Sequence, residues 1–570
     1  MYKKNLIIAI SIAIIIAGLY KILPIKKSSL AYLFQQSGQK AIVAKFDTAK
    51  NKIIKIQDST VYENIRWVDS TTSGVLKDSL KYLSIKQPLF TNLQIWPGGL
   101  FSNIKGSVAS IVLSGFYDEK LIAFFKLLSK SPHQQYVSYN AAMEAPSYQL
   151  PWYPWQAQSS KEYILSFRHI FTISKKFAPA VQIVWSPAGV PGAEEYWPGN
   201  DFVDLISINI DLDKAPKQGP YPPYGSVAEL MRRKLLRMRF MNKPILFLAQ
   251  KTAQKEIIQQ QWLDELNTEI LADIAIFRTP IIPTEHDTSL ANKSRVNKLE
   301  LGVYDPSLQL AGQPSITTEH IFTDLISVTN GVFKKDFDAA TSRKHNVIVT
   351  MEPWKDGIKE KDPQILSNTL NGHYDKIWTR LYEIISAVPQ TVYLRWGHEM
   401  EIPIERYAWQ SKDPVGYIKA FRYFATFKQP RPSNIKIVWG PAGDRGSVEY
   451  YPGDDVVDFV SVAIYGLPDK DINDYNRQQS FATIFQYKFY RMRFTHRPVF
   501  ITEFGVKGPE AYKKKWLEAA AATINKYPEI FGCSYFNFKD TPKAWGNAET
   551  PDWSISDTTF KSFTSFINLN

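Results

Sequence analysis

The chain has 570 residues, more than the roughly 250 that a (β/α)8 barrel needs, so we expect two domains. Apolar residues make up 44% and aromatic residues 14%, enough for two large cores, and the single cysteine, Cys533, excludes a disulfide framework and a cysteine-rich metal site. The formal net charge of +13 would suit an anionic partner, but no phosphate-binding loop or nucleic-acid motif accompanies it. We therefore interpret the charge as a solvated basic surface and predict no nucleic-acid binding and no cofactor.

Residues 1–28 form the first predicted segment, distinct from the folded body. Lys3 and Lys4 precede an apolar stretch that, counted from Leu6 to Leu23, has 18 residues, near the lower limit for spanning a bilayer. A secretory signal peptide would have a similar pattern. Because no small-x-small cleavage site follows, we favour an uncleaved single-pass anchor, in the inner membrane if the cell is Gram-negative. In either case we expect the remainder to be periplasmic or extracellular.

Residues 41–297 and 298–570 share short motifs at a nearly constant spacing. GFYD at 115–118 matches GHYD at 372–375, and 372 − 115 = 257. VWSPAG at 184–189 matches VWGPAG at 438–443, and the RMRF at 237–240 recurs at 491–494; here 438 − 184 = 254 and 491 − 237 = 254. A constant spacing over whole supersecondary units indicates duplication of a domain.

Each half alternates short apolar segments with amphipathic helical segments such as 374–387 and 513–526, which is typical of a parallel β/α fold. We therefore predict an α/β protein of two tandem (β/α)8 barrels preceded by one N-terminal transmembrane helix. The polar run at 287–297 is the predicted junction between the barrels.

Two predicted strands of the second half each lead to a carboxylate. The apolar segment 392–394 is followed by Arg395, His398 and Glu399, and the segment 498–501 is followed by Glu503. In a parallel barrel, residues just past the C-terminal strand ends form the active-site face. Paired carboxylates there suit glycoside hydrolysis, in which one protonates the leaving oxygen while the other attacks or shields the anomeric carbon.

Five motifs of the second half together resemble glycoside hydrolase family 26, which includes β-mannanases and β-1,3-1,4-glucanases. They are TMEPW at 350–354, RWGHEM at 395–400, IVWGP at 437–441, YYPGD at 450–454 and TEFG at 502–505. The resemblance covers residues 299–570 and implies a retaining enzyme.

By this resemblance, Glu399 is the acid/base, Glu503 the nucleophile and His398 a sugar ligand, while Tyr465 hydrogen-bonds the nucleophile. The family often continues its HEM motif with asparagine, whereas this chain has Glu401, so the sugar and the linkage stay open.

Further ligands are predicted from residue type and position. Arg395 is either a charge partner within the site or a buried salt bridge of the barrel, and both interpretations stay open. Trp354 and Trp545 follow apolar runs near predicted strand ends and are candidate platforms for sugar stacking. No second His or Cys lies at ligand spacing from His398, so we predict no metal site.

The first half lacks both carboxylates. Ala142 aligns with Glu399, and Ala249 aligns with Glu503. A methyl group can neither carry a proton nor form a glycosyl ester, so we predict that residues 41–297 form a catalytically silent domain. Its aromatic residues, such as Trp155, either form a sugar-binding groove or are packed in a structural module.

The leading hypothesis is a membrane-tethered retaining endo-β-glycosidase that hydrolyses a mannan- or β-glucan-type polysaccharide outside the cytoplasm. Two alternatives stay open: a non-catalytic glycan-binding or polysaccharide-export protein, and a transglycosylase of exopolysaccharide synthesis. The predicted partners are the polysaccharide and, through residues 1–28, the membrane.

Overall fold

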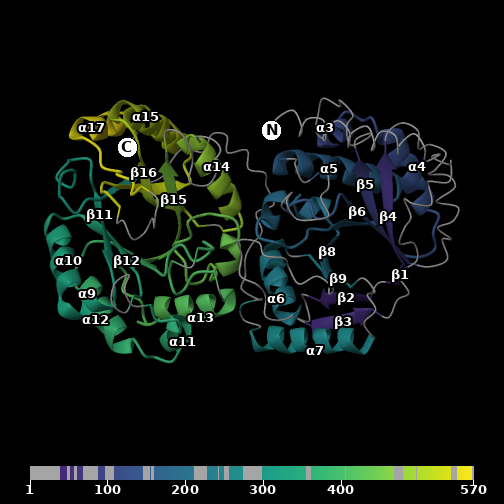
Figure 1. The fold of residues 1–570 in the computed structure, drawn as a ribbon, viewed down its shortest axis with the longest axis horizontal. Helices are drawn as coiled ribbons and strands as arrows, with labels where there is room; N and C mark the ends of the chain where they lie inside the picture. The colour runs from purple at the N-terminus through teal and green to yellow at the C-terminus, as the bar shows by residue number, and fades with distance from the viewer. Residues whose placement is uncertain are drawn as a thin grey trace, which may run out of the picture.

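The computed structural model describes two units that lie side by side (Figure 1). The N-terminal unit comprises residues 39–40, 42–47, 52–56, 61–68, 88–96, 108–145, 155, 159–210, 227–241, 243–249, 256–273 and 276. The C-terminal unit comprises residues 298–354, 361–404, 406–411, 413–467, 479–495, 497–540 and 549–567. The predicted anchor at 1–28 lies outside these ranges, and none of the helices within them is long and apolar enough to cross a membrane.

The C-terminal unit is a closed barrel of eight parallel strands, which confirms the predicted (β/α)8 fold for this half. Its strands are β10 (Glu300–Tyr304), β11 (Thr318–Thr323), β12 (Asn346–Met351), β13 (Val392–Trp396), β14 (Ile435–Trp439), β15 (Phe459–Gly466), β16 (Val499–Val506) and β17 (Ile530–Phe536). Its helices are α9 (Leu325–Asn330), α10 (Val332–Ser342), α11 (Ile365–Leu370), α12 (Asp375–Ser386), α13 (Pro414–Ala425), α14 (Phe481–Met492), α15 (Glu510–Lys526) and α17 (Asp557–Phe566).

A layer of apolar side chains packs together from four barrel strands: Ile348, Tyr393, Val438 and Phe500. Side chains two positions apart on a strand share a face, so the next layer towards the C-terminal strand ends consists of Thr350, Arg395, Gly440 and Thr502. The change from apolar to polar side chains along the same strands places the polar groups at the C-terminal end of the barrel.

Helix α13 shows how the sequence fixes the elements next to this end. Asp413 accepts a hydrogen bond from the backbone N–H of Gly416 at 3.0 Å, and Pro414 occupies the first turn, where its missing N–H costs nothing. Apolar residues at helical spacing are buried against the sheet, and among them Tyr417 donates its hydroxyl hydrogen bond to Gly397 O at 3.1 Å. The helix thereby anchors the backbone that follows β13.

The N-terminal unit contains a nine-stranded sheet in the order β1-β4-β5-β6-β7-β8-β9-β2-β3. Its strands are β1 (Gln39–Lys40), β2 (Ile42–Asp47), β3 (Lys52–Ile56), β4 (Val61–Val68), β5 (Leu89–Trp96), β6 (Gln135–Tyr139), β7 (Gln182–Trp185), β8 (Leu205–Ile210) and β9 (Ile245–Ala249). Its helices include α3 (Val108–Leu113), α4 (Asp118–Leu128), α5 (Ser160–Phe177), α6 (Val227–Met238) and α7 (Glu256–Ala272), with short 3-10 turns at η3 (Ala193–Tyr196) and η4 (Asn200–Phe202).

The prediction of a second closed parallel barrel is not met by the described residues of the N-terminal unit. Strands β4 to β9 are parallel, but β2 pairs antiparallel with β9 and continues into β3. The reason is that β2 pairs with the free edge of β9, which an eighth parallel strand would need in order to close a barrel. Residues 277–282, which align with most of β17 at the 254-residue spacing, lie outside the described part of the chain.

The same local geometry recurs in both units at the spacing found in the sequence. The Trp155 indole donates to Ala141 O at 2.9 Å, as Trp409 donates to His398 O at 2.8 Å. The backbone N–H of Ala142 donates to Ser186 O at 2.8 Å, as that of Glu399 donates to Gly440 O at 2.8 Å. The alignment of the two halves on these residues is therefore matched by equal hydrogen bonds.

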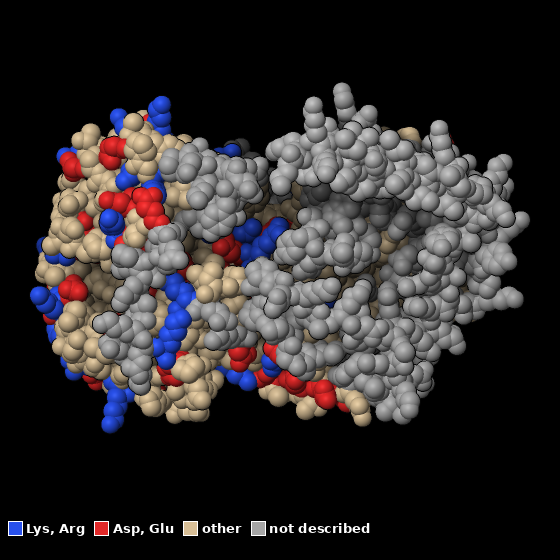
Figure 2. All heavy atoms as spheres, in the orientation of Figure 1, with Lys and Arg blue, Asp and Glu red and all other residues tan. Residues whose placement is uncertain are grey.

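The interface between the units is also reciprocal. Carboxylates at equivalent positions each bind arginines of the other unit, Glu195 with Arg491 and Glu449 with Arg237. The equivalent rings of Phe240 and Phe494 have centroids 5.7 Å apart. Acidic and basic side chains lie next to each other where the units meet, and they are interspersed over the C-terminal unit (Figure 2). The interface thus resembles an isologous contact, in which one patch meets its own equivalent.

Candidate active site

Arg395 connects three strand ends at the C-terminal end of the barrel. Its side chain is 1% exposed, and its Nε donates to Thr350 Oγ1 at 2.9 Å while Nη1 donates to Thr502 Oγ1 at 2.8 Å. Its Nη2 forms an ion pair with Glu503 Oε1. Arg395 is therefore a buried salt bridge of the barrel whose partner is the candidate nucleophile, and its part in a catalytic site stays a prediction.

Glu503 has a hydrogen-bond donor on each carboxylate oxygen. Arg395 binds Oε1, and the Tyr465 hydroxyl donates to Oε2 at 3.0 Å. The Tyr465 ring packs against Trp553, with centroids 4.7 Å apart, and the carboxylate itself is buried. These contacts leave Glu503 little freedom to rotate.

Glu399 has a backbone conformation that residues other than glycine rarely adopt. Its φ is 53°, shortly after Gly397 with φ 55°, and its N–H donates to Gly440 O at 2.8 Å. Its own carbonyl accepts from Gln410 Nε2 at 3.0 Å. Positive φ in a non-glycine residue costs energy and is concentrated at functional sites.

Burial and the anionic Glu503 raise the pKa of Glu399 to about 8, although Arg406 opposes the shift. Burial also raises the pKa of Glu352 to about 7, with Glu503 adding to the effect and Arg406 opposing it. Near neutral pH, Glu399 is therefore mostly protonated and Glu352 is close to half protonated, beside Glu503, whose carboxylate is paired with Arg395.

His398 lies near Glu352 and the rings of Tyr407 and Trp409, which together with Trp354 form an aromatic wall. Burial, with help from the Arg395 cation, keeps its pKa well below the usual value, so the ring is neutral. Its Nε2 is 3.8 Å from Glu352 Oε1 and 3.4 Å from the Tyr407 hydroxyl, and its Nδ1 has no hydrogen-bond partner among the described residues. The ring is 2% exposed and this nitrogen is buried, so the role of His398 as a sugar ligand stays a prediction.

Trp354 and Trp545 have different outcomes. Trp354 is only 2% exposed and packs against Tyr407 and Trp409, at centroid distances of 5.2 and 5.5 Å. Its ring is buried among these aromatic residues and exposes no face on which a sugar could stack. Trp545 lies outside the described residues. No group of three or more metal-ligating side chains occurs in the described ranges.

Five residues around His398 and Glu399 were given no role from the sequence, although the first of them lies in the TMEPW motif at 350–354: Glu352, Arg406, Tyr407, Trp409 and Gln410. Glu352 follows β12 as Glu399 follows β13, so its place at a strand end was a usable signal. The other four lie in the segment after Glu399, which forms no helix or strand and has no apolar period to place it. Only contact with His398 and Glu399 reveals their role.

The equivalent place in the N-terminal unit keeps the backbone and has different side chains. Asn140 and Ala142 have φ of 43° and 57°, matching Gly397 and Glu399. Ser138 stands where the C-terminal unit has Arg395, and Ser186 stands where it has Gly440.

The glycine and the arginine are linked physically. A Cβ at Gly440 would lie 2.5 Å from Arg395 Cδ, so a side chain at 440 is compatible only with a small residue at 395. The serine pair of the N-terminal unit satisfies this requirement.

Comparisons with known proteins give distant matches. No family model matches the chain. The beta-1,3-xylanase TXYA of Vibrio sp is 26% identical over 159 residues, which cover 26% of this chain and 30% of that protein. The chain therefore spans less than a third of the length of this curated relative.

Among solved structures, a Cellulomonas fimi endo-beta-1,4-mannanase double mutant has 14% identity and a TM-score of 0.33, covering 47% of this chain and 70% of that one. Bacillus subtilis mannanase man26 has 16% identity and a TM-score of 0.30, covering 43% and 81%. Prevotella bryantii endo-beta-mannanase/endo-beta-glucanase PbGH26A-GH5A has 13% identity and a TM-score of 0.34, covering 89% and 92%. Scores this low assign no fold, so the barrel assignment rests on its own strand order.

Proposed function

We propose that the C-terminal barrel is a retaining endo-β-glycosidase that hydrolyses a β-linked polysaccharide. The observation that carries this proposal is the pair of carboxyls with different surroundings, Glu399 after β13 and Glu503 within β16. Glu503 is held by the Arg395 cation and the Tyr465 hydroxyl, whereas Glu399 has a pKa raised to about 8 by burial and by Glu503. One group is suited to attack and the other to donate a proton.

In the first step, Glu503 attacks the anomeric carbon and the bond to the leaving oxygen breaks as Glu399 transfers its proton to that oxygen. The glycosyl ester removes the negative charge from Glu503, so the pKa of Glu399 falls. In the second step, Glu399 accepts a proton from water, the water attacks the anomeric carbon, and Glu503 leaves as a carboxylate. Retention by this route needs carboxyl groups ~5 to 5.5 Å apart.

Arg395 and Tyr465 act on the nucleophile in this scheme. Their hydrogen bonds orient the carboxylate and stabilise the negative charge that returns when the ester is hydrolysed. His398, whose pKa is lowered by burial, and Glu352, whose pKa is raised by burial to about 7, are the further groups that we assign to sugar hydroxyls.

The rest of the chain has supporting roles in this proposal. We infer that the N-terminal unit is a duplicated copy that has lost both carboxylates, with Ala142 and Ala249 in their places. Residues 1–28 tether the protein to the membrane, with both units outside the cytoplasm, where the polysaccharide is met.

The test is incubation of the full chain in detergent with β-1,4-mannan, mixed-linkage β-1,3-1,4-glucan and β-1,3-xylan, the last suggested by the name of the curated relative. We expect release of reducing ends from at least one polymer and none with Glu503→Gln. Binding without release would support the glycan-binding alternative, and products longer than the substrate would indicate transglycosylation.

A further inference from the structure

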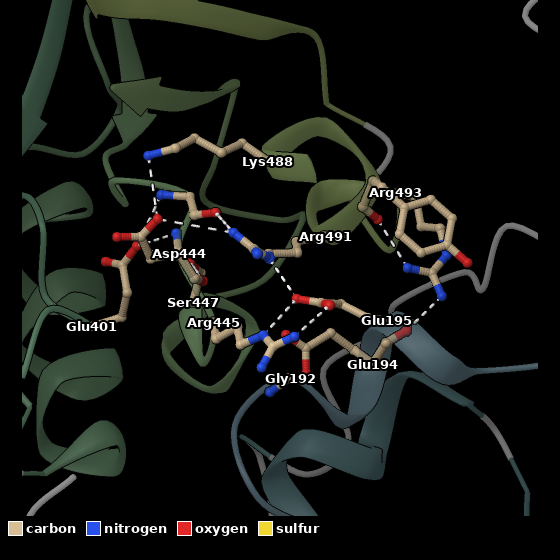
Figure 3. A network of polar contacts seen from close by, with 12 residues as sticks. Gly192, Glu194, Glu195, Glu401, Asp444, Arg445, Ser447, Lys488, Arg491 and Arg493 are labelled. Atoms are coloured by element: carbon tan, nitrogen blue, oxygen red, sulfur yellow. Dashed lines mark hydrogen bonds and ion pairs between the residues drawn. The ribbon is translucent and has the colours of Figure 1, made fainter. Parts of the chain in front are cut away.

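Glu195 of the N-terminal unit binds two arginines of the C-terminal unit. It lies in η3 and accepts hydrogen bonds from Arg491 Nε at 2.7 Å, Arg445 Nε at 3.1 Å and Arg445 Nη2 at 3.2 Å (Figure 3). Its side chain is 10% exposed and that of Arg491 13% exposed, so this pair is shielded from water, whereas the side chain of Arg445 is 42% exposed. Burial opposes ionisation, but the two arginines outweigh it and lower the pKa of Glu195.

Residues 440–447 follow β14, and we call them the β14 loop. Both arginines that bind Glu195 are connected with this loop. Arg445 is part of the loop. Arg491, on α14, donates from Nη1 to Gly443 O at 2.9 Å, and Lys488, one turn earlier, donates to Ala442 O at 2.8 Å. Lys488 also pairs with Asp444 Oδ1 at 3.3 Å (Figure 3). Glu195 therefore fixes the side chains by which the barrel holds this loop.

The β14 loop in turn holds the backbone on both sides of the Glu399 side chain. Gly440 O accepts the N–H of Glu399 at 2.8 Å. The Glu401 carboxylate accepts the N–H groups of Gly443 at 2.8 Å and Asp444 at 3.0 Å, and the Ser447 hydroxyl at 2.8 Å. Because Glu399 has a φ of 53°, its conformation depends on such external contacts.

We propose that Glu195 is a positioning residue for Glu399, so that the N-terminal unit organises the acid/base of the barrel across the interface. The path runs from Glu195 through Arg445 and Arg491 to the β14 loop, and from the loop to the segment 399–401. This inference rests on the proposed function. It assigns the N-terminal unit a part in the reaction, although this unit has alanine at both catalytic positions.

The equivalent contacts that start from Glu449, on the other side of the interface, lead to a residue without a carboxyl group. Glu449 binds Arg237, which donates to Gly189 O at 2.5 Å, and Glu144 accepts the N–H of Gly189 at 2.7 Å. That path leads to Ala142, where no proton can be transferred. Only the path from Glu195 ends at a side chain that can transfer a proton, Glu399.

The test compares Glu195→Gln with the wild-type full chain on two substrates that differ in their need for an acid. On the polysaccharide, whose leaving group requires a proton, we expect kcat/KM to fall about tenfold, within the range that general acid catalysis contributes. On an aryl glycoside with a good leaving group, the rate of glycosyl-enzyme formation should change less than about twofold, because that step needs no proton. In a Glu399→Ala background, Glu195→Gln should cause no further loss on the polysaccharide.

Asp204→Asn is the matched control, because Asp204 forms a comparable ion pair with Lys175 inside the N-terminal unit, away from the interface. It should leave both substrates unaffected. An equal loss on both substrates with Glu195→Gln, or no loss on either, overturns the positioning role.

Hydrogen exchange separates this inference from the proposed function. Peptides covering 397–411 and 440–447 should exchange faster in Glu195→Gln than in the wild type or in Asp204→Asn. Unchanged exchange overturns the inference whatever the activity. Faster exchange in a chain that cleaves no polysaccharide supports the coupling and counts against the proposed function alone.

Discussion

The two carboxyls Glu399 and Glu503 differ in their neighbours, and this difference predicts different rescue behaviour. Glu503→Ala removes the group that forms the ester, so turnover should stop on every substrate, and azide should restore it with inverted configuration. Glu399→Ala should spare activated aryl glycosides in the first step and slow deglycosylation, with azide restoring turnover with retention. On the polysaccharide the loss should be about 10² to 10⁴. The anomeric configuration of the azide products by NMR checks the assignment; the opposite pattern would exchange the two roles.

In the proposed mechanism, Glu399 also sets the pH dependence of polysaccharide cleavage. Its pKa is raised to about 8, so it is protonated at neutral pH and loses its proton as pH rises through that value. The acid must be protonated for the first step, so kcat/KM on the polysaccharide should fall above about pH 8. For Glu399→Ala with an activated aryl glycoside, this decline should vanish. A decline that persists in the variant would assign it to another group, such as Glu352.

The same raised pKa has a consequence for stability. Between the ordinary value for a glutamate and about 8, the folded chain binds a proton that the unfolded chain has lost, so stability falls as pH rises through this window. Glu399→Gln removes the effect. Its melting temperature should exceed that of the wild type at pH 9 but differ little at pH 4, and an equal difference at both pH values would refute the assigned environment.

Residues that follow an apolar run could be assigned to the C-terminal end of the barrel from the sequence, and residues in irregular segments could not. Arg395, Glu399 and Glu503 follow apolar runs, so their place at one end of the barrel could be predicted. Arg406 and Tyr407 lie in a segment without regular structure. Their contact with the site depends on how that segment folds back, which no local pattern encodes.

At the scale of elements, the ends of β13 and β14 must fit each other. Gly440→Ala would place a Cβ 2.5 Å from Cδ of the buried Arg395 and so displace the partner of Glu503. We expect kcat/KM to fall by about 10²-fold, as misplacement of a catalytic group by about 1 Å can do. Gly312→Ala is the control, since a Cβ there meets nothing within 4 Å, and it should retain activity. Full activity in Gly440→Ala would show that Arg395 is not needed where it lies.

Elements also show where the fold could not be predicted. The parallel strands of both units follow from short apolar runs between helical segments. At the 257-residue spacing, β2 aligns with the parallel strand β10, because 42 + 257 = 299 and 47 + 257 = 304, so the alignment predicted a parallel strand there and not the antiparallel pairing with β9. The strand β3 aligns with 309–313, where the C-terminal unit has no strand. Aligning the two halves predicts the elements that they share, but it cannot predict an element that only one half has.

At the scale of the whole molecule, the buried charges of the interface should dominate its stability. Glu449 is 1% exposed and pairs with Arg233 and Arg237, which are 3% and 0% exposed. Glu449→Ala leaves two buried guanidinium groups without this partner, which should cost about 3–5 kcal/mol in denaturant unfolding. Lys334→Ala breaks the exposed pair with Asp338 and should cost about 0.5 kcal/mol or less. Equal small effects would mean that the units barely depend on this contact.

The central claim is that the chain forms a covalent glycosyl-enzyme on Glu503. The direct measurement is peptide mass spectrometry of the full chain, quenched in acid after reaction with a 2-deoxy-2-fluoro glycoside of the sugar identified by the polysaccharide panel, since the fluorine slows release of the ester. We predict one added glycosyl mass on the peptide that contains Glu503 and none in Glu503→Gln. An adduct on the peptide that contains Glu399, or an adduct that persists in Glu503→Gln, would contradict the account.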